Sequence, residues 1–348
     1  LFFFISLTIN IFFSQNPTNS LPRVLKIIFI IFFTVDALRI FDKYEFNSIK
    51  NIFVIWFFIF SIILFDVFFE IVFGFNLTGN KTWESRIASF FGEELVVGAF
   101  VHGFALFILS FLVSQNKKIY ILLLSILLIL TASFYIGERS NFIKLFICIS
   151  LFSLIALKFN FFHKILILFS ITGIILTILN FNETLKSRYY YIYDMILEKN
   201  GIEKFYKSSQ YGAHKDAALN IFKEYPVFGV GIKNFRYESG KPKYYNEKYA
   251  ATKIRQATHP HQIHLEFLSE TGLFGYLSFL IFILSSLIVS FKNYLKNRNI
   301  FQLSGIIFIF STLIPLLPSG SFLSTFNSGI FWINFIIMTT FYKKLKLD

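Results

Sequence analysis

Residues 258–267 read THPHQIHLEF, and residues 268–291 continue as LSETGLFGYLSFLIFILSSLIVSF. The second part is long and apolar enough for a membrane helix, which takes about 20 mostly apolar residues. Three histidines, His259, His261 and His264, lie directly before it. Packing alone does not account for a cluster of titratable side chains at the edge of a bilayer, so this stretch predicts a membrane helix with chemistry at one end.

The rest of the chain extends this picture to a polytopic helical bundle. Of its 348 residues, 55% are hydrophobic and 51 are phenylalanine, which is typical of an integral membrane protein and excludes an ordinary soluble domain. The chain begins at Leu1 inside an apolar run, so we expect a truncated N-terminus. We predict an all-α fold of about ten spans, at residues 1–13 (partial), 24–41, 52–75, 95–113, 119–136, 141–157, 164–181, 268–291, 300–317 and 321–341.

One long polar loop, residues 182–264, divides the chain into N-terminal membrane helices (1–181) and C-terminal membrane helices (265–348). If this loop faces outward, the inward connections and C-terminal tail carry twelve Lys and Arg residues and the short outward connections carry six. Positive charge favours the cytoplasmic side. We therefore predict a bacterial inner-membrane protein with the loop in the periplasm and the C-terminus in the cytoplasm. Arg86, Arg139 and the histidines would then share the outward face.

The long loop is basic, with 14 Lys and Arg against 8 Asp and Glu between residues 182 and 264. Long loops translocate regardless of charge, so this excess favours an anionic partner such as a phosphate or phospholipid, with an ordinary solvated loop as the alternative. We expect no nucleic-acid partner. Within the loop, residues 213–223 have helical spacing, and Pro226 is expected to end that helix.

Other polar residues in the apolar runs do not point to a catalytic role. The single cysteine, Cys148, lies in an apolar run and forms no internal disulfide. Asp66 and Glu70 lie one turn apart within a span, and we expect the intramembrane charges to pair among themselves.

Five short motifs together resemble the O-antigen ligase/polymerase superfamily of bacterial membrane proteins. The main three are PVFGVGIKNF (226–235), HPHQIHL (259–265) and ETGLFG (270–275). Two earlier ones are GERSN (137–141), in a short outward turn, and RIASFFGEE (86–94), which is similar to a stretch of polymerase-like members. The resemblance covers about residues 119–291.

The resemblance implies transfer of a glycan from polyprenyl (undecaprenyl) diphosphate to an acceptor sugar hydroxyl, in O-antigen or surface polysaccharide assembly. The acceptor is a lipid-linked glycan in a polymerase, slightly favoured by residues 86–94, or lipid A-core in a ligase. Histidine suits a general base at neutral pH, and arginine suits a diphosphate leaving group. We predict His261 as the base, with His259 or Gln262 orienting it, and no metal or cofactor.

We predict Arg139 as the diphosphate ligand, with Arg86 and Arg188 as further cations. Two departures from the family pattern concern this site. Gln262 replaces the usual Asn, and near Tyr211, where many relatives have an Arg, the chain offers only His214 and Lys215. Glu270 is expected to brace a histidine or an arginine.

Three other readings stay open. A transporter or flippase for lipid-linked glycans predicts paired charges at the midplane and internal repeats, which the sequence lacks. A non-enzymatic export scaffold predicts that His261→Ala leaves glycan assembly intact. A metalloenzyme using His259, His261 and His264 lacks an HExxH-type partner set.

Overall fold

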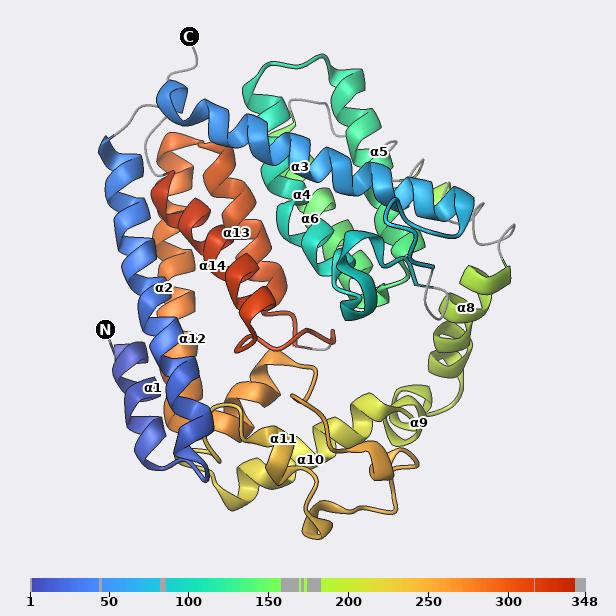
Figure 1. Ribbon diagram of the computed structural model, residues 1–348, viewed down its shortest axis with the longest axis vertical. Coiled ribbons are helices and arrows are strands. Elements are labelled where there is room, and N and C mark those ends of the chain that lie inside the picture. The colour runs from blue at the N-terminus through green and yellow to red at the C-terminus, as the bar shows by residue number, and fades with distance from the viewer. Residues whose placement is uncertain are drawn as a thin grey trace. The chain divides into compact units, whose positions relative to one another are not determined.

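The computed structural model describes residues 2–43, 46–81, 86–157, 169, 172–173, 183–315 and 317–341, apart from some side chains within helices. Within these ranges the protein is all-α, as predicted (Figure 1). Among the described residues, five helices are long and apolar enough to cross a membrane: α3 (Phe46–Phe73), α4 (Val97–Ser114), α5 (Ile119–Ile136), α6 (Arg139–Ala156) and α12 (Ile263–Asn297).

Further helices match the other predicted spans. They are α1 (Phe2–Phe12), α2 (Pro17–Lys43), α13 (Ile300–Thr312) and α14 (Thr325–Thr340). The predicted span 164–181 lies outside the described residues except at positions 169, 172 and 173. Several boundaries differ from expectation: α2 begins at Pro17 rather than near residue 24, α12 begins before its apolar run, and α13 ends at Thr312 rather than near residue 317.

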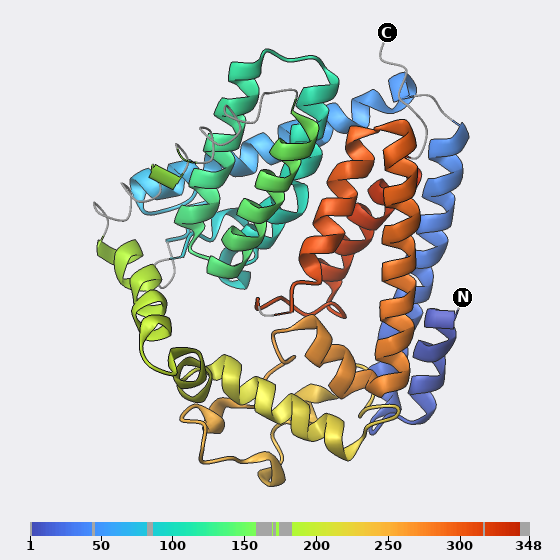
Figure 2. The same ribbon diagram turned by 180° about the vertical axis from the view of Figure 1, so that it is seen from behind.

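The chain divides into two compact units, which we describe separately. Unit 2 comprises residues 38–190, 290–311 and 333–348. Its helices α4, α5 and α6 contact one another (Figure 2). Its core is aromatic: the Phe53 ring lies 5.0 Å from Phe107 and 4.9 Å from Phe301, measured between ring centroids.

The carboxylates of α3 hold the loop that follows this helix. Asp66 accepts hydrogen bonds from the Leu77 amide (2.7 Å) and the Ser89 hydroxyl (2.6 Å). Glu70 accepts from the amides of Ala88 and Ser89 at 3.1 and 2.7 Å. Because buried backbone N–H groups need partners, the two carboxylates fix the loop that carries residues 86–94.

Unit 1 comprises residues 1–37, 191–289 and 312–332. In this unit α1 packs along the first part of α12, where the Phe3 ring stacks on Phe282 with centroids 5.4 Å apart (Figure 1). Asn10 adds a polar link, because its side-chain amide donates to the Phe228 carbonyl at 2.6 Å and its oxygen accepts from the Ile232 amide at 3.1 Å.

Helix α12 is kinked at Gly272, whose φ of 63° and ψ of −168° lie outside the helical range. The kink frees the Ser269 and Glu270 carbonyls, which accept from the Val230 and Gly231 amides at 3.0 and 2.9 Å. On the other side of the kink, the Leu273 amide donates to the Pro226 carbonyl at 2.8 Å. The glycine-rich turn and the ETGLFG segment are therefore one interlocked structure.

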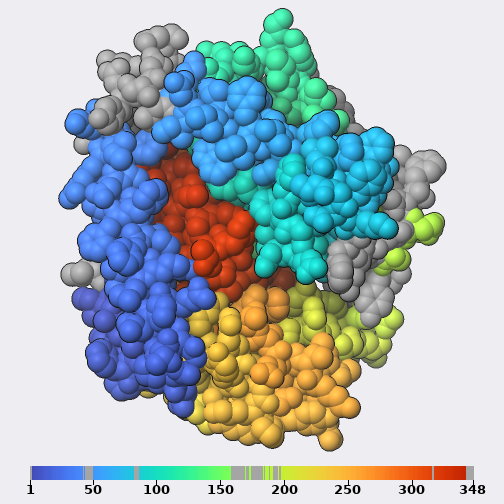
Figure 3. All heavy atoms as spheres, in the orientation of Figure 1, coloured from blue at the N-terminus to red at the C-terminus, as the bar shows by residue number. Residues whose placement is uncertain are grey.

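The polar segment contains α8 (Glu183–Leu197), α9 (Gly201–Ser208), α10 (Gln210–Glu224), α11 (Phe235–Glu238), η2 (Pro242–Tyr244) and η3 (Thr252–Ile254). The predicted helix 213–223 is confirmed within α10, whose Ala217, Ala218 and Ile221 side chains pack against Val230 and Phe235. In Figure 3 the side chains of residues 225–262, coloured yellow to orange, form a continuous surface. The loop is therefore a folded layer with its own small core.

Candidate active site

The two histidines of the His-Pro-His sequence lie in the turn just before α12. His261 has a φ of 54°, in the left-handed region that side chains other than glycine seldom adopt. Its carbonyl accepts a hydrogen bond from the Ser319 amide at 2.8 Å. Gln262 secures the same turn, because its oxygen caps the Leu265 amide at 2.8 Å and its amide donates to the Pro315 carbonyl at 2.8 Å. Strained backbone held in this way is typical of functional sites.

Three imidazole rings are brought together here. The His261 centroid lies 4.1 Å from that of His259 and 5.1 Å from that of His214, and the His214 ring is within 24° of parallel. Tyr211, on the same face of α10, presents its ring edge to His261 at 5.9 Å. Thus α10 and the turn before α12 supply one cluster from residues about 45 positions apart.

Burial keeps these imidazoles neutral. It lowers the pKa of His261 to about 3, and the neighbouring charges of His259 and His214 add to this effect. Burial likewise lowers the pKa of His259 to about 4, with Lys233 contributing, and it lowers the pKa of His214. A neutral imidazole has a lone pair that can accept a proton, so the cluster meets the first requirement of a general base.

Several polar atoms around this cluster are buried and lack a hydrogen-bond partner within the described structure. They are Nδ1 of His214, Nε of Arg236 and the Ser319 hydroxyl. The His214 Nε2–H faces the Ile254 carbonyl at 3.1 Å, which leaves Nδ1 with its lone pair. Buried polar groups are normally paired, so a concentration of unpaired ones suits a polar ligand.

Lys233 is a buried cation of the same region, and its role was not predicted from the sequence. Its ammonium donates to the Ser321 hydroxyl at 2.6 Å and lies 3.9 Å from a Glu266 oxygen. Glu266 also accepts from the Phe322 amide at 2.7 Å. The influence of Lys233 and Arg236 on the His259 pKa places both cations near that ring. The only sequence signal was a lysine inside the apolar, glycine-rich run 226–235.

Two other residues near the histidines, His264 and Glu270, make hydrogen bonds that hold the local backbone and side chains in place. His264 uses both ring nitrogens, on the Leu313 carbonyl (2.9 Å) and the Tyr276 hydroxyl (3.0 Å), in agreement with a packing role. Glu270 accepts from the Lys233 and Phe235 amides at 2.7 and 3.3 Å, so its carboxylate braces the glycine-rich turn rather than an imidazole.

The other predicted cations do not join the histidines within unit 1. The Lys215 ammonium lies over the Tyr206 ring, 4.5 Å from its centroid. Arg86, Arg139 and Arg188 belong to unit 2, and the Arg188 side chain falls outside the described residues. A shared site between these arginines and the histidines stays a prediction.

Within unit 2, two of the predicted motifs meet at Glu138. Its carboxylate accepts from the Gly98 amide at 2.9 Å and the Asn141 side chain at 2.5 Å, and a Cβ at Gly98 would lie 2.7 Å from its carboxyl carbon. Burial raises the pKa of Glu138, and the charge of Arg86 opposes this effect. The GERSN turn therefore lies near Arg86, whose buried Nε has no hydrogen-bond partner among the residues that the structure describes.

Across the described ranges, no group of three or more His, Cys, Asp and Glu side chains is arranged to hold a metal ion. Metal-independent transfer stays a prediction that requires its own test.

Comparison with known proteins confirms the resemblance. Residues 119–280 match the family model of the O-antigen ligase family. The match includes the GERSN turn, the glycine-rich turn and the three histidines, and it supports an O-antigen ligase-like glycosyl-transfer function in a multi-pass membrane protein. No curated protein matches the chain.

Proposed function

We propose, from the premise of O-antigen ligase-like glycosyl transfer, that the chain moves a glycan from polyprenyl diphosphate to an acceptor sugar hydroxyl. The observation that carries this proposal is the cluster of His214, His259 and His261, surrounded by buried polar atoms that have no partner within the described ranges. The acceptor is a lipid-linked glycan, as in a polymerase, and lipid A-core is the alternative.

The chemistry needs one base and a stabilised leaving group. His261 accepts the proton of the acceptor hydroxyl as that oxygen attacks the anomeric carbon. The bond from this carbon to the diphosphate oxygen breaks, and the diphosphate leaves with the electron pair. His259 and His214 both lie close to the ring of His261 and limit its orientation. General-base catalysis of this kind contributes about 10²–10⁴-fold.

Neutralisation of the departing diphosphate is the second requirement, and Lys233 and Arg236 are the cations of unit 1 near His259. A guanidinium forks onto phosphate oxygens and stays charged at all working pH values, which favours Arg236 for direct contact. Lys233 is already held by Glu266 and Ser321, so it contributes a fixed positive charge behind the site. Arg139 and Arg86 remain our proposed cations from unit 2.

The same proposal includes the topology and the division of the chain. Residues 182–264 form a periplasmic layer between membrane helices 1–181 and 265–348 in the inner membrane. The substrates are then a lipid-linked donor and an acceptor presented at that face, with the C-terminus in the cytoplasm.

The test is deletion of the gene in its host and gel analysis of the surface glycolipid, with rescue by wild type, His261→Ala or His163→Ala. His163 lies outside the described residues and serves as a control histidine from a predicted inward loop. We expect rescue by wild type and the control only. Full rescue by His261→Ala would exclude this residue as the base.

The same gel separates the two acceptors. Loss of the ladder with a single repeat still on the core indicates a polymerase. Loss of all repeats from the core, with polymer left on polyprenyl diphosphate, indicates a ligase. Transfer by the purified protein should persist in EDTA, and its loss would show a metal requirement.

A further inference from the structure

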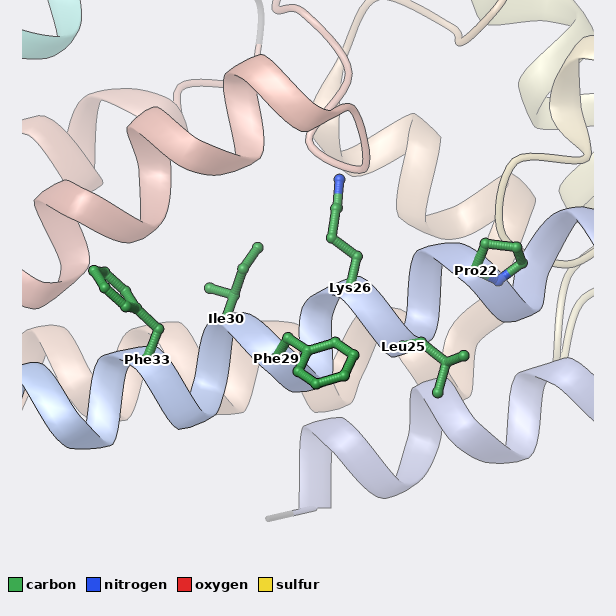
Figure 4. A pocket seen from close by; sticks show the side chains of 6 residues that line it. All are labelled: Pro22, Leu25, Lys26, Phe29, Ile30 and Phe33. Atoms are coloured by element: carbon green, nitrogen blue, oxygen red, sulfur yellow. The ribbon is translucent and has the colours of Figure 1, made fainter.

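An apolar groove runs along the surface of α2 in unit 1. It has a volume of about 560 Å³ and is lined by Pro22, Leu25, Lys26, Phe29, Ile30 and Phe33 (Figure 4). This volume lies within the range of about 300–1,000 Å³ that is usual for ligand sites. The space-filling view shows α2, in blue, on the surface of the molecule (Figure 3). Phe29 and Phe33 are 70% and 64% exposed, so the groove is open to surrounding lipid.

Lys26 is the only charged residue of this lining. Its ammonium nitrogen is buried and has no hydrogen-bond partner within the described structure. The charges that act on it most are those of Arg23 and Lys233, which have the same sign, and Glu266 acts more weakly. Figure 4 shows the Lys26 side chain rising from α2 toward the loop that precedes α14. A buried ammonium with no hydrogen-bond partner among the described residues, and with two cations nearby, favours an anionic ligand.

We infer that this groove binds the donor lipid, with its diphosphate at Lys26 and its prenyl chain along Leu25, Phe29 and Phe33. This inference rests on the proposed function and assigns the donor a site outside the segment that matches the family. The ligand must be an anionic head joined to a long hydrocarbon, because the lining combines one cation with an otherwise apolar surface.

The direction of the groove agrees with this ligand. The first turns of α2 are bound to the glycine-rich turn, where the Ser20 hydroxyl donates to the Ile232 carbonyl at 2.8 Å and Asn234 donates to the same hydroxyl at 3.1 Å. The charged end of the groove thus lies beside residues 232–234, next to Lys233. Its apolar end continues along α2, within the predicted span 24–41. A lipid in this position has its head toward Lys233 and its tail along a span that the sequence predicts to lie in the membrane.

Photocross-linking tests this site without depending on transfer. p-Benzoylphenylalanine replaces Phe33, which lines the groove, or Phe32, which is equally exposed at 64% but does not line it. Each variant, in the His261→Ala background, is placed in nanodiscs of phosphatidylethanolamine and phosphatidylglycerol with radiolabelled undecaprenyl diphosphate. We expect at least about fivefold more cross-linking at position 33 than at position 32.

The head group is tested by Lys26→Met, with Lys26→Arg and Lys117→Met as controls. Removing a charge-assisted contact worth about 1.5–3 kcal/mol should lower cross-linking about tenfold or more, whereas both controls should retain it. Unlabelled undecaprenyl diphosphate should compete, and undecaprenol should not.

Equal labelling at positions 32 and 33, or equal competition by phosphatidylglycerol, would show ordinary boundary lipid and overturn the inference. Unchanged cross-linking in Lys26→Met would do the same. If the groove result holds while His261→Ala rescues the host, the proposed catalytic base fails and the lipid site stands. If the groove result fails while His261→Ala does not rescue the host, the lipid site is excluded and the catalytic proposal stands.

Discussion

At the scale of single residues, the histidine pair was predictable and its third member was not. The sequence places His259 and His261 on either side of Pro260, which restricts how far their rings can separate. His214 lies on another helix, and only the departure from the family pattern near Tyr211 drew attention to it. The structure stacks His214 on His261 at 5.1 Å. A ring that approaches from a distant helix requires the tertiary fold, which local spacing does not contain.

The lowered histidine pKa values predict an unusual pH profile. The base acts in its neutral form, so kcat/KM should stay constant from about pH 8 to pH 5 and fall only as the pH approaches the His261 pKa of about 3. Initial rates over this range provide the measurement, and an acid limb near pH 6.5 would contradict it. As the pH falls, the free energy of unfolding decreases before kcat/KM does. The reason is that the unfolded histidines take up protons below their ordinary pKa of 6.5, whereas the folded ones do not. Short assays separate the two effects.

Lys233 provides a second residue-scale prediction. Lys233→Met leaves the buried Glu266 carboxylate without its cation, which should cost about 3–5 kcal/mol of stability. The double variant Lys233→Met with Glu266→Gln removes both charges and should recover most of that loss. Thermal unfolding of the detergent-solubilised protein measures both, and a single variant as stable as wild type would show that the pair is not coupled. The double variant should still lose donor affinity, because the fixed charge behind the site is gone.

At the scale of elements, the glycine-rich turn (226–235) and the ETGLFG segment (270–275) are separate in the sequence but are bound to each other in the structure. The sequence indicated tight turns at Gly229 and Gly231, but not that they pair with a kink in α12. Gly229 has a φ of 67°, and a Cβ there would lie 2.5 Å from the Glu270 carbonyl carbon. Only glycine permits two backbones to approach so closely. This pairing depends on contacts about 40 residues apart, so hydrophobic periodicity does not report it.

Substitution at the kink tests this contact. In Gly272→Ala the new Cβ would collide with the Val227 carbonyl oxygen and the residue would keep a φ of 63°, so we expect the free energy of unfolding to fall by about 2–4 kcal/mol. Gly79→Ala is the matched control, because Gly79 has a φ of 86° but nothing within 4 Å of its Cβ, and strain alone costs about 1–2 kcal/mol. Thermal unfolding and limited proteolysis of the loop measure both. Equal losses would mean that conformation, and not close approach, requires Gly272.

At the scale of the whole molecule, most helices could be predicted from the apolar composition of the chain, whereas the candidate site could be predicted only in part. Apolar runs of bilayer length specify helices because lipid offers no partners to unpaired backbone groups. The prediction 119–136 therefore matches α5, Ile119–Ile136. Polar residues at helix ends give no such signal, and α2 begins at Pro17, ahead of its apolar run. The hydrogen bonds that Asp66 and Glu70 accept from loop amides were not predicted for a related reason, since these contacts cannot be read from charge spacing.

The topology prediction rests on the whole chain and is tested at Lys243, an exposed residue of the long loop. Lys243→Cys should react with a membrane-impermeant maleimide in intact spheroplasts, because the charge bias of the short loops places residues 182–264 outside. The native Cys148 is buried, so it provides an unreactive background. Lys117→Cys, in a predicted inward loop, should react only after permeabilisation. Protection at Lys243 with labelling at Lys117 would invert the protein in the membrane, and the histidine cluster would then face the cytoplasm, where a periplasmic glycan acceptor could not reach it.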